Sequence, residues 1–385
     1  MLKDVYVIGV GMHPFGKHGI STRDMAFYAG QQALQDAGVS FQQVGALYSG
    51  YIGGTMLEGV TYAKDYGLTG LPVVHVENAS ATGSSAFREA VLAVAGGHSE
   101  IAMAVGFDDM LTLGMRMGML EMIEGPKVEQ IVLPAAFFAL WAVRRMHDCG
   151  TKVETYAKIA AKNWNHARFN PNAQRQSDHE VTPEEILRSN MVAYPHTSMM
   201  ACAAGAGAAC AIVASKEVAR KVANGRPLVR VIASQMQSER YTEGHVFLGA
   251  VVGPSELTAT TSKAAYDQAG VGPEAMSLVH VHDAFPIEEL MYYELLGFCG
   301  PGEGDRLVAE GATSLGGRIP FSTDGGLIAR GHPGGPTGLA QIWECTLQLR
   351  GQAQQRQVPG ARMALAHMMG AGSVCVIHIL SKEKA

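Results

Sequence analysis

Three short segments hold residues whose types suit nucleophilic catalysis. Ser80 follows the strand-like run 73–77 and precedes a helical pattern, and His332 lies in the Gly-rich run 324–335 just before another helical pattern. His282 closes a third apolar run. A strand, a sharp turn and a helix around a small hydroxyl residue can present a nucleophile, which an adjacent imidazole activates. Free N–H groups at the start of a helix also favour an anion. We therefore predict one site that unites these three residues.

Each of these residues also has a purely structural interpretation. A serine before a helix is a common N-cap, and His282 and His332 both suit structural histidines in a core or cap. A fourth segment, residues 367–373, is predicted to be a Gly-rich turn between strands at 362–366 and 374–380. The backbone of this turn could line a pocket.

The elements that would position these segments recur along the chain. Residues 33–39 (Ala-Leu-Gln-Asp-Ala-Gly-Val) and 265–271 (Ala-Tyr-Asp-Gln-Ala-Gly-Val) lie 232 positions apart. Each follows a helix-like run and precedes a short polar link and an apolar run. Alternating helices and apolar strands indicate sheets that are covered on both faces. We therefore predict an α/β fold with two similar halves.

The region between the two copies, about 110–190, is richer in methionine and charge and predicts an inserted helical and loop subdomain. Met115, Met117 and Met119 are interpreted either as core filler or as a flexible apolar wall for a bulky substrate. Residues 191–215 are mostly apolar, but their Pro, His and Gly residues favour a buried turn, strand and helix over a membrane span.

The composition narrows the class of protein. The chain has 385 residues, of which 47% are hydrophobic and 17% charged, so a large core is expected. A net charge of −5 argues against nucleic-acid binding. The six cysteines form no C-x-x-C pair, which argues against a metal site and favours a reduced, cytoplasmic chain with buried thiols. The first residues lack a signal-peptide pattern, and we expect no membrane association.

Taken together, the motifs resemble the thiolase superfamily, and most closely the sterol-carrier-protein-type thiolases and their acetyl-CoA acetyltransferase-like bacterial and archaeal relatives. The resemblance rests on the segments around Ser80, His282, His332 and residues 367–373, with Asn163, His166-Ala167, Asn170-Pro171-Asn172-Ala173 and Gly205–Ala211. It implies a duplicated α/β fold in five αβαβα layers with an inserted loop domain. The expected parts are an N-terminal half (1–112 and 190–255), the inserted subdomain (113–189) and a C-terminal half (256–385).

The resemblance also implies roles for individual residues. In the family, a cysteine at the position of Ser80 attacks an acyl-CoA thioester, the histidine matching His332 activates it, and the histidine matching His282 lines an oxyanion site. A second oxyanion site would lie near Gly370. The oxyanion and pocket residues implied in this way are Gly370, Ala371, Asp283 and Phe285. The family's acid/base cysteine would match Met368 or Ala284, so this chain lacks a thiol at all three positions.

The function implied is CoA-dependent cleavage, or Claisen formation, of a 3-oxoacyl-CoA in lipid or aromatic degradation. Coenzyme A would be a substrate, with no bound cofactor. Ser80 is then either an engineered substitution that traps substrate or a natural variant. Two alternatives stay open: a retro-aldol lyase acting on acyl-CoA, whose relatives use tyrosines around the two histidine motifs, and a non-catalytic acyl-CoA-binding subunit. The expected partners are a second copy of the chain and a small zinc-ribbon/OB-fold protein.

Overall fold

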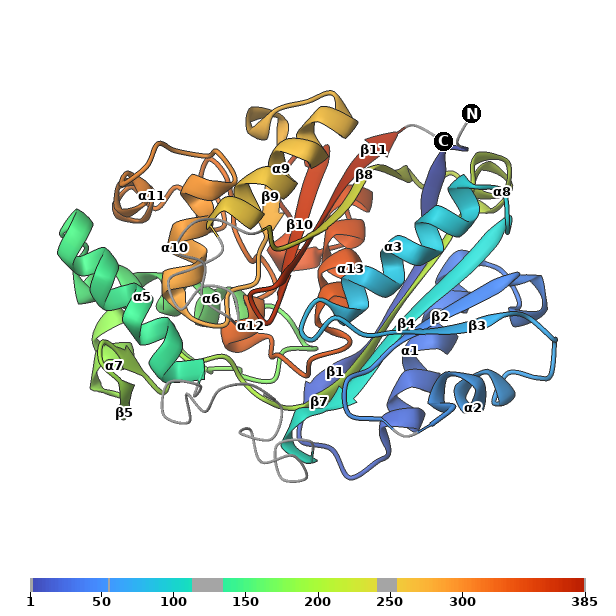
Figure 1. Ribbon diagram of the computed structural model, residues 1–385, viewed down its shortest axis with the longest axis horizontal. Helices are drawn as coiled ribbons and strands as arrows, with labels where there is room; N and C mark the ends of the chain where they lie inside the picture. Colours follow the sequence, from blue (N-terminus) through green and yellow to red (C-terminus); the bar gives the residue numbers. More distant parts are fainter. Residues whose placement is uncertain (1–2, 55, 113–133, 241–254, 384–385) are drawn as a thin grey trace.

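A nine-stranded sheet is the centre of the computed structural model, which describes residues 3–54, 56–112, 134–240 and 255–383 (Figure 1). The strand order is β3-β2-β4-β7-β1-β8-β11-β10-β9, and β5 and β6 form a separate pair. The strands are β1 (Val5–Gly16), β2 (Ala46–Gly50), β3 (Val73–Val76), β4 (Ile101–Asp109), β5 (Met191–Ala193), β6 (His196–Thr197), β7 (Ala206–Ser215), β8 (Leu228–Ser238), β9 (Leu278–His280), β10 (Met363–Gly370) and β11 (Val374–Glu383).

Helices cover both faces of this sheet. They are α1 (Thr22–Ala37), α2 (Glu58–Lys64), α3 (Thr82–Ala95), α5 (Pro134–Cys149), α6 (Val153–Ala167), α7 (Pro183–Arg188), α8 (Lys216–Val222), α9 (Ser255–Ala269), α10 (Pro286–Leu295), α11 (Gly304–Ala309), α12 (Gly326–Ala329) and α13 (Thr337–Arg350). Three 3-10 turns, η1 (Phe41–Gln43), η2 (Pro273–Ala275) and η3 (Gln354–Arg356), join them to the strands. Because β7 is buried along its whole length, both of its faces lie within the core.

The predicted duplication is confirmed by the strand order. Counting outward from the centre, β1, β7, β4 and β2 of the first half match β8, β11, β10 and β9 of the second. A single bridge between Val279 and Phe321 stands where β3 stands in the first half. The helices that precede the two repeated motifs end alike, at Gly38 with φ 68° and Gly270 with φ 69°. The antiparallel pairing of β1 with β8 joins the two halves into one continuous sheet.

The two helices that follow the predicted site segments form the middle layer. α3 packs on β2 and β4 of the first half and also on β8 and β11 of the second, and α13 likewise contacts β1, β7 and β10. α1 covers β1, β7 and β4 from outside, and α9 covers β8 and β11. The layers are therefore a helix, the first half of the sheet, the middle helices, the second half of the sheet and a helix, which is the predicted five-layer arrangement (Figure 1).

The crossing of α3 and α13 depends on glycine. A Cβ atom at Gly83 would lie 2.3 Å from the Gly335 carbonyl oxygen and 3.2 Å from the Leu339 nitrogen. We therefore expect Gly83→Ala to lower the free energy of unfolding by about 1–3 kcal/mol, because the helices would have to separate. Urea unfolding measures the change. Gly19→Ala is the matched control, because a Cβ there meets nothing within 4 Å, and an equal loss in both variants would contradict the prediction.

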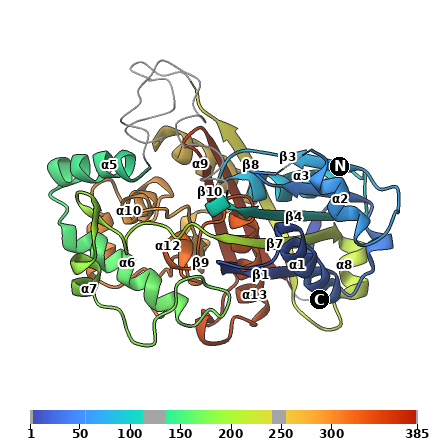
Figure 2. The ribbon, with the colours of Figure 1, turned by 90° about the horizontal axis from the view of Figure 1, so that it is seen from below.

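The helices α5, α6 and α7 gather at the end of the molecule opposite α1, α2 and α8, as the two ribbon views agree (Figures 1 and 2). They come from the region predicted as an inserted subdomain, and α6 packs against α10 and α12 of the second half. The domain boundaries drawn from the sequence stay a prediction. Met115, Met117 and Met119 lie outside the described residues.

Three local predictions are wrong. The segment 367–373 is not a turn throughout, because β10 continues to Gly370 and only residues 371–373 turn. The run 191–215 holds the strands β5, β6 and β7 and no helix, since its last ten residues complete the sheet. Not all thiols are buried, because Cys149 is exposed. Within the described ranges, no helix has both the length and the apolar character to cross a membrane.

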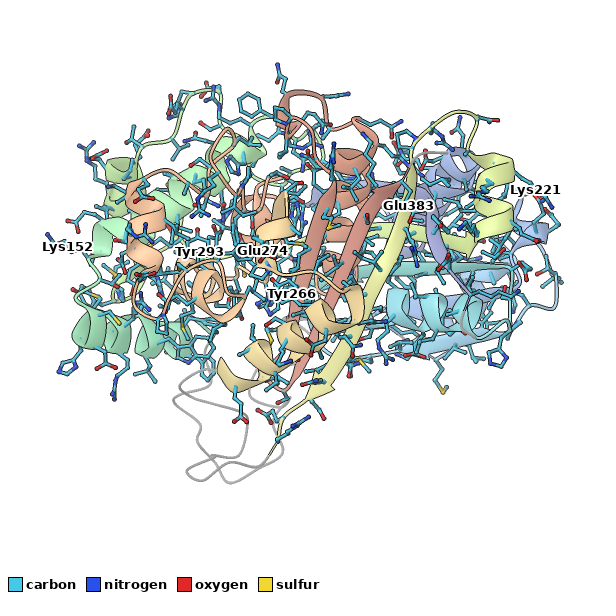
Figure 3. The ribbon with its side chains drawn as sticks, turned by 90° about the horizontal axis from the view of Figure 1, so that it is seen from above. Lys152, Lys221, Tyr266, Glu274, Tyr293 and Glu383 are labelled. Atoms are coloured by element: carbon cyan, nitrogen blue, oxygen red, sulfur yellow. The ribbon has the colours of Figure 1, made fainter. Side chains whose placement is uncertain are left out.

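The two ends of the described chain meet on the sheet. Tyr6 in β1 donates its hydroxyl to Glu383 at the end of β11, over 2.9 Å. Figure 3 labels Glu383 beside the long strands, well away from Lys152 at the start of α6. This contact ties the first strand of one half to the last strand of the other.

Candidate active site

Ser80 lies in a tight turn between β3 and α3. Ala79 has φ 47°, in the left-handed region, and the Ala81 N–H donates to the Asn78 carbonyl over 2.9 Å. The N-cap residue of α3 is Ala81, which makes no side-chain cap. Ser80 is therefore not an N-cap serine: its Oγ lies 2.9 Å from Nε2 of His332. The turn therefore brings the hydroxyl to a histidine of the second half.

Hydrogen bonds fix both the backbone and the ring of His332. Its backbone N–H donates to the Ala203 carbonyl over 2.8 Å, and its Nδ1 lies 2.9 Å from Oγ1 of Thr337, the first residue of α13. With the proton on Nδ1 donated to Thr337, Nε2 is free to accept the hydroxyl proton of Ser80. Burial, together with the charges of His282 and Arg330, holds the pKa of His332 well below its usual value. The ring is therefore neutral at pH 7, as a base must be.

His282 approaches the pair from the end of β9. Its ring centroid lies 5.4 Å from that of His332, and the two rings are nearly perpendicular. Its Nδ1 lies 2.9 Å from Oε1 of Glu288 in α10. The structure therefore brings together all three residues that the sequence singled out, from β9 and from the turns before α3 and α13.

The predicted oxyanion and pocket residues divide into two groups. Gly370 lies against the Ser80 turn, since a Cβ there would come within 2.2 Å of the Asn78 carbonyl oxygen, and Ala371 follows with φ 48°. Asp283 instead accepts hydrogen bonds from Asn163 and from the Leu327 N–H, over 2.7 and 2.8 Å. Phe285 packs its ring on those of Phe138 and His196. Gly370 therefore lies beside the Ser80 turn, whereas the contacts of Asp283 and Phe285 hold the surrounding scaffold. A pocket role for Ala371, which is exposed, stays a prediction.

Sequence reasoning missed a carboxylate beneath the His332 loop. Asp108, near the end of β4, accepts the backbone N–H groups of Ile52, Gly53 and Gly335 over 3.0, 3.1 and 2.7 Å. Burial raises the pKa of Asp108 to about 7, although these three donors favour the charged form. The carboxylate ties the segment after β2 to the loop that carries His332. A lone Asp after an apolar strand gives no signal for such a contact.

Thr337, Glu288 and Tyr292 were also missed. No role was predicted from the sequence for any of these three residues. A search for polar residues at helical spacing after His282 would have found both Glu288 and Tyr292, because they are four residues apart on one face of α10.

Buried histidines make the fold sensitive to acid. Burial is the main cause that lowers the pKa values of His166, His367 and His378 to about 3 and that of His196 to about 4. In the unfolded chain a histidine titrates near pH 6.5. Between about pH 4 and 6.5 the unfolded chain therefore binds more protons, so stability rises with pH across this window. Asp108, whose folded pKa is raised, acts in the opposite direction.

We expect the free energy of unfolding to fall between pH 6.5 and pH 5, by up to about 1.4 kcal/mol per pH unit for each buried histidine. Urea unfolding at several pH values measures this slope. His166→Gln removes one titrating group and should make the slope shallower. A stability that is flat from pH 5 to 6.5 would contradict the assignment of these rings as neutral in the folded state.

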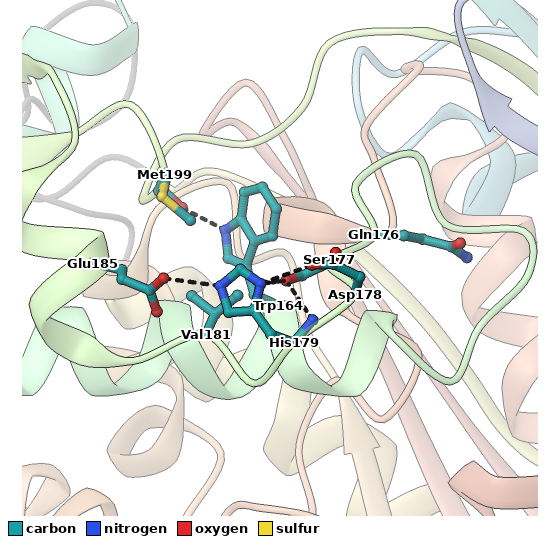
Figure 4. Close-up of a pocket in the computed structure, with 8 residues that line it drawn as sticks. All are labelled: Trp164, Gln176, Ser177, Asp178, His179, Val181, Glu185 and Met199. Carbon is teal, nitrogen blue, oxygen red and sulfur yellow. Dashed lines mark hydrogen bonds and ion pairs between the residues drawn. The ribbon is translucent and has the colours of Figure 1, made fainter.

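A separate surface pocket of ≈ 430 Å³ holds none of the residues predicted from the sequence (Figure 4). In it, His179 lies between Asp178 and Glu185, at 2.8 and 2.9 Å, with its own side chain 60% exposed. These are solvated ion pairs, which stabilise a fold little. Among the described residues, no group of His, Cys, Asp and Glu side chains is arranged to hold a metal ion.

Two family models match most of the chain. The model described as "Thiolase, N-terminal domain" matches residues 5–194, and the model described as "Thiolase C-terminal domain-like" matches residues 252–382. Together they span the strands and helices that supply Ser80, His282 and His332. They match segments of both halves of the sheet, and β7 and β8 lie between the two matched ranges.

Individual relatives agree with these models. Sterol carrier protein 2 of Homo sapiens is 33% identical over 395 residues, which cover 98% of this chain and 71% of that protein. The benzoylsuccinyl-CoA thiolase subunit BbsB of Thauera aromatica is 34% identical over 377 residues, covering 96% and 95%. The solved Ltp2-ChsH2(DUF35) aldolase has the same fold, with a TM-score of 0.84, 22% identity and 98% of both chains covered. The resemblance read from the motifs is confirmed: this chain belongs to the thiolase family of acyltransferases.

Proposed function

We propose that this chain catalyses CoA-dependent cleavage of a 3-oxoacyl-CoA, or the reverse Claisen condensation. The observation that carries the proposal is the 2.9 Å contact between Oγ of Ser80 and Nε2 of His332. It places a nucleophile beside a neutral base at the start of a buried helix, where N–H groups favour developing negative charge. The thiolase-family models and the relatives that are thiolases support the same reaction class.

The cleavage begins when Ser80 Oγ attacks the 3-oxo carbon and passes its proton to Nε2 of His332. The bond between C2 and C3 then breaks, its electron pair stays on C2 as an enolate, and the acyl group remains on Ser80 as an ester. His282 and the backbone near Gly370 would stabilise the negative oxygen atoms. The enolate takes up a proton at C2 and departs as a CoA thioester. The thiol of CoA then attacks the ester and gives up a proton in return, and Ser80 leaves with the proton from His332.

A serine makes this sequence harder than a cysteine would. A hydroxyl is far less ionised than a thiol of pKa about 8.5, so it depends wholly on His332. The ester formed on Ser80 is also less reactive toward CoA than a thioester. We therefore expect slow turnover by the parent chain and accumulation of the acyl-enzyme.

The test compares the parent chain with Ser80→Cys and Ser80→Ala on a panel of 3-oxoacyl-CoA thioesters, with intact mass read in parallel. We expect Ser80→Cys to turn over faster than the parent and to carry an acyl adduct, and Ser80→Ala to do neither. Turnover by Ser80→Cys alone would mark the serine as a disabling substitution. No cleavage and no adduct in either the parent or Ser80→Cys would refute the proposal.

A retro-aldol lyase is the second candidate, and the residue types at the site favour it in one respect. This chain has Ser80, Ala284 and Met368 at the three positions where the family has thiols. A lyase does not need these thiols, because its reaction forms no acyl-enzyme. Against it, both histidine motifs keep their histidines. Cleavage of a 3-hydroxyacyl-CoA without any mass adduct, in both the parent and Ser80→Ala, would favour the lyase.

The proposal also covers the oligomeric state, the partner subunit and the cellular compartment. We propose a cytoplasmic homodimer that binds acyl-CoA and CoA and works with a small zinc-ribbon/OB-fold subunit. The names of two similar proteins support a partner subunit. The Thauera aromatica relative is called a thiolase subunit, and the solved aldolase is named after two components, Ltp2 and ChsH2(DUF35). Native mass and zinc content of the protein purified from its own cells test both parts. A protein that binds acyl-CoA in such a complex, yet stays inactive as Ser80→Cys, would be a non-catalytic subunit.

A further inference from the structure

A buried carboxylate stands behind His282. Oε1 of Glu288 lies 2.9 Å from Nδ1 of His282, and the side chains are only 2% and 8% exposed. The same oxygen accepts the hydroxyl of Tyr292 over 3.1 Å. Two donors on one carboxylate oxygen fix the orientation of the group, so the imidazole has a defined partner on its Nδ1 side.

This contact decides which nitrogen of His282 is available. Because Nδ1–H donates to the carboxylate, Nε2 is the nitrogen that can take up or release a proton. Nε2 lies on the opposite side of the ring from Glu288, is buried, and has no hydrogen-bond partner among the described residues. The ring stands beside that of His332, whose own Nε2 contacts Ser80. Nε2 of His282 therefore lies at the predicted site, and no hydrogen bond to the described residues occupies it.

Three imidazoles meet here, and among these three only His282 is paired with a carboxylate of the described residues. His332 from the loop before α13 contacts Thr337 and Ser80, and His367 from β10 accepts the His282 backbone N–H over 3.5 Å. The groups that face His282 are thus Glu288 and Tyr292 on α10, His332 and His367. Of the three rings, His282 is therefore the one with a carboxylate beside it that can stabilise a positive charge formed during proton transfer.

We propose that His282 carries out the proton transfer at carbon for which the family uses a thiol, and that Glu288 is its positioning residue. This inference rests on the proposed function. In cleavage, the His282 imidazolium gives its Nε2 proton to C2 as the bond between C2 and C3 breaks, so a C–H bond forms and the ring becomes neutral. The thiol of CoA then returns a proton to Nε2 as its sulfur attacks the Ser80 ester. In condensation the same nitrogen removes the proton from C2.

The thiol of Cys202 does not serve this purpose. The Cys202 backbone N–H donates to the carbonyl of Ala284, the residue that matches a family thiol, over 2.8 Å. Burial raises the pKa of the Cys202 thiol to about 12. A base is needed in condensation, and a thiol that stays protonated at pH 7 is not one.

The experiment measures exchange of the C2 hydrogens of acetyl-CoA in D₂O, by mass, with every protein made in the Ser80→Ala background. Exchange needs only proton removal and return at C2, so it does not depend on acyl transfer. Glu288→Gln should lower the exchange rate by about 10²- to 10⁴-fold. Tyr292→Phe keeps the carboxylate and should cost less than about tenfold.

Glu288→Asp separates charge from packing, since it restores the carboxylate on a shorter side chain. Its exchange rate should stay near that of the Ser80→Ala protein. Exchange at an unchanged rate in Glu288→Gln would overturn the inference, as would equal losses in the Asp and Gln variants or no exchange by the folded Ser80→Ala protein. Failure of cleavage by Ser80→Cys with exchange intact would instead count against the proposed function alone.

Discussion

Alanine at position 332 should lower the thiolytic rate of the Ser80→Cys protein by about 10²- to 10⁴-fold, which raises the barrier by about 3–5 kcal/mol. The reason is the direct contact of His332 Nε2 with the side chain at position 80, at 2.9 Å in the serine form. Without the imidazole, the introduced thiol would have no adjacent group to take its proton. Steady-state cleavage of a 3-oxoacyl-CoA measures the loss.

A second measurement separates this effect from misfolding. The rate at which iodoacetamide alkylates the introduced thiol at pH 6.5 reports its thiolate fraction, and His332→Ala should lower that rate. Thr337→Val keeps the ring but removes its partner at Nδ1, 2.9 Å away, and should cost about tenfold. Alkylation and cleavage at undiminished rates in His332→Ala would show that another group is the base.

Arg330→Met should lower the free energy of unfolding by about 3–5 kcal/mol, the largest stability effect that we expect from a single substitution. Arg330 Nη1 lies 2.5 Å from Oδ2 of Asp324, and both side chains are fully buried. Burial alone would raise the pKa of Asp324, but the charges of Arg330 and His280 hold it at about 2. The substitution would leave that carboxylate buried without its main partner.

Chemical unfolding of the two proteins gives the difference. Arg306→Met is the matched control, because Arg306 is 57% exposed and its carboxylate partners lie 3.5 and 3.7 Å away, so it should cost about 0–1 kcal/mol. Asp324→Asn combined with Arg330→Met should regain part of the loss, since no charge is left buried. Equal costs for the two arginine variants would contradict the importance of this pair.

Most of the fold could be predicted from the sequence because its pattern is repeated. The helix, Gly stop, 3-10 turn and strand at 22–50 recur 232 positions later, and η1 (Phe41–Gln43) and η2 (Pro273–Ala275) keep this spacing. The fusion of the two halves through β1 and β8 could not be predicted. Pairing between strands more than 200 residues apart depends on shape and burial, which local pattern does not encode.

The site residues that could be predicted are reactive side chains that lie next to a recognisable strand end or helix start. Ser80, His282 and His332 each stand at the junction of an apolar run and a turn, so their side chains were expected at a sheet edge or helix start. Glu288 and Asp108 could not be found in this way. Glu288 looks like an ordinary acidic residue in the first turn of a helix, and Asp108 acts through backbone groups of Ile52, Gly53 and Gly335, which have no sequence signature.

The joined sheet has a consequence for how the protein matures. β1 leaves the ribosome long before its partner β8, which begins at Leu228, and β11, the partner of β8, ends only at Glu383. Contacts over such separations form slowly and leave strand edges unpaired meanwhile. Ser80 and His332 come from opposite halves of the chain. A nascent or truncated chain therefore lacks the contact between them until both halves have folded. Reactivity of residue 80 would therefore appear only with the last cooperative step of folding.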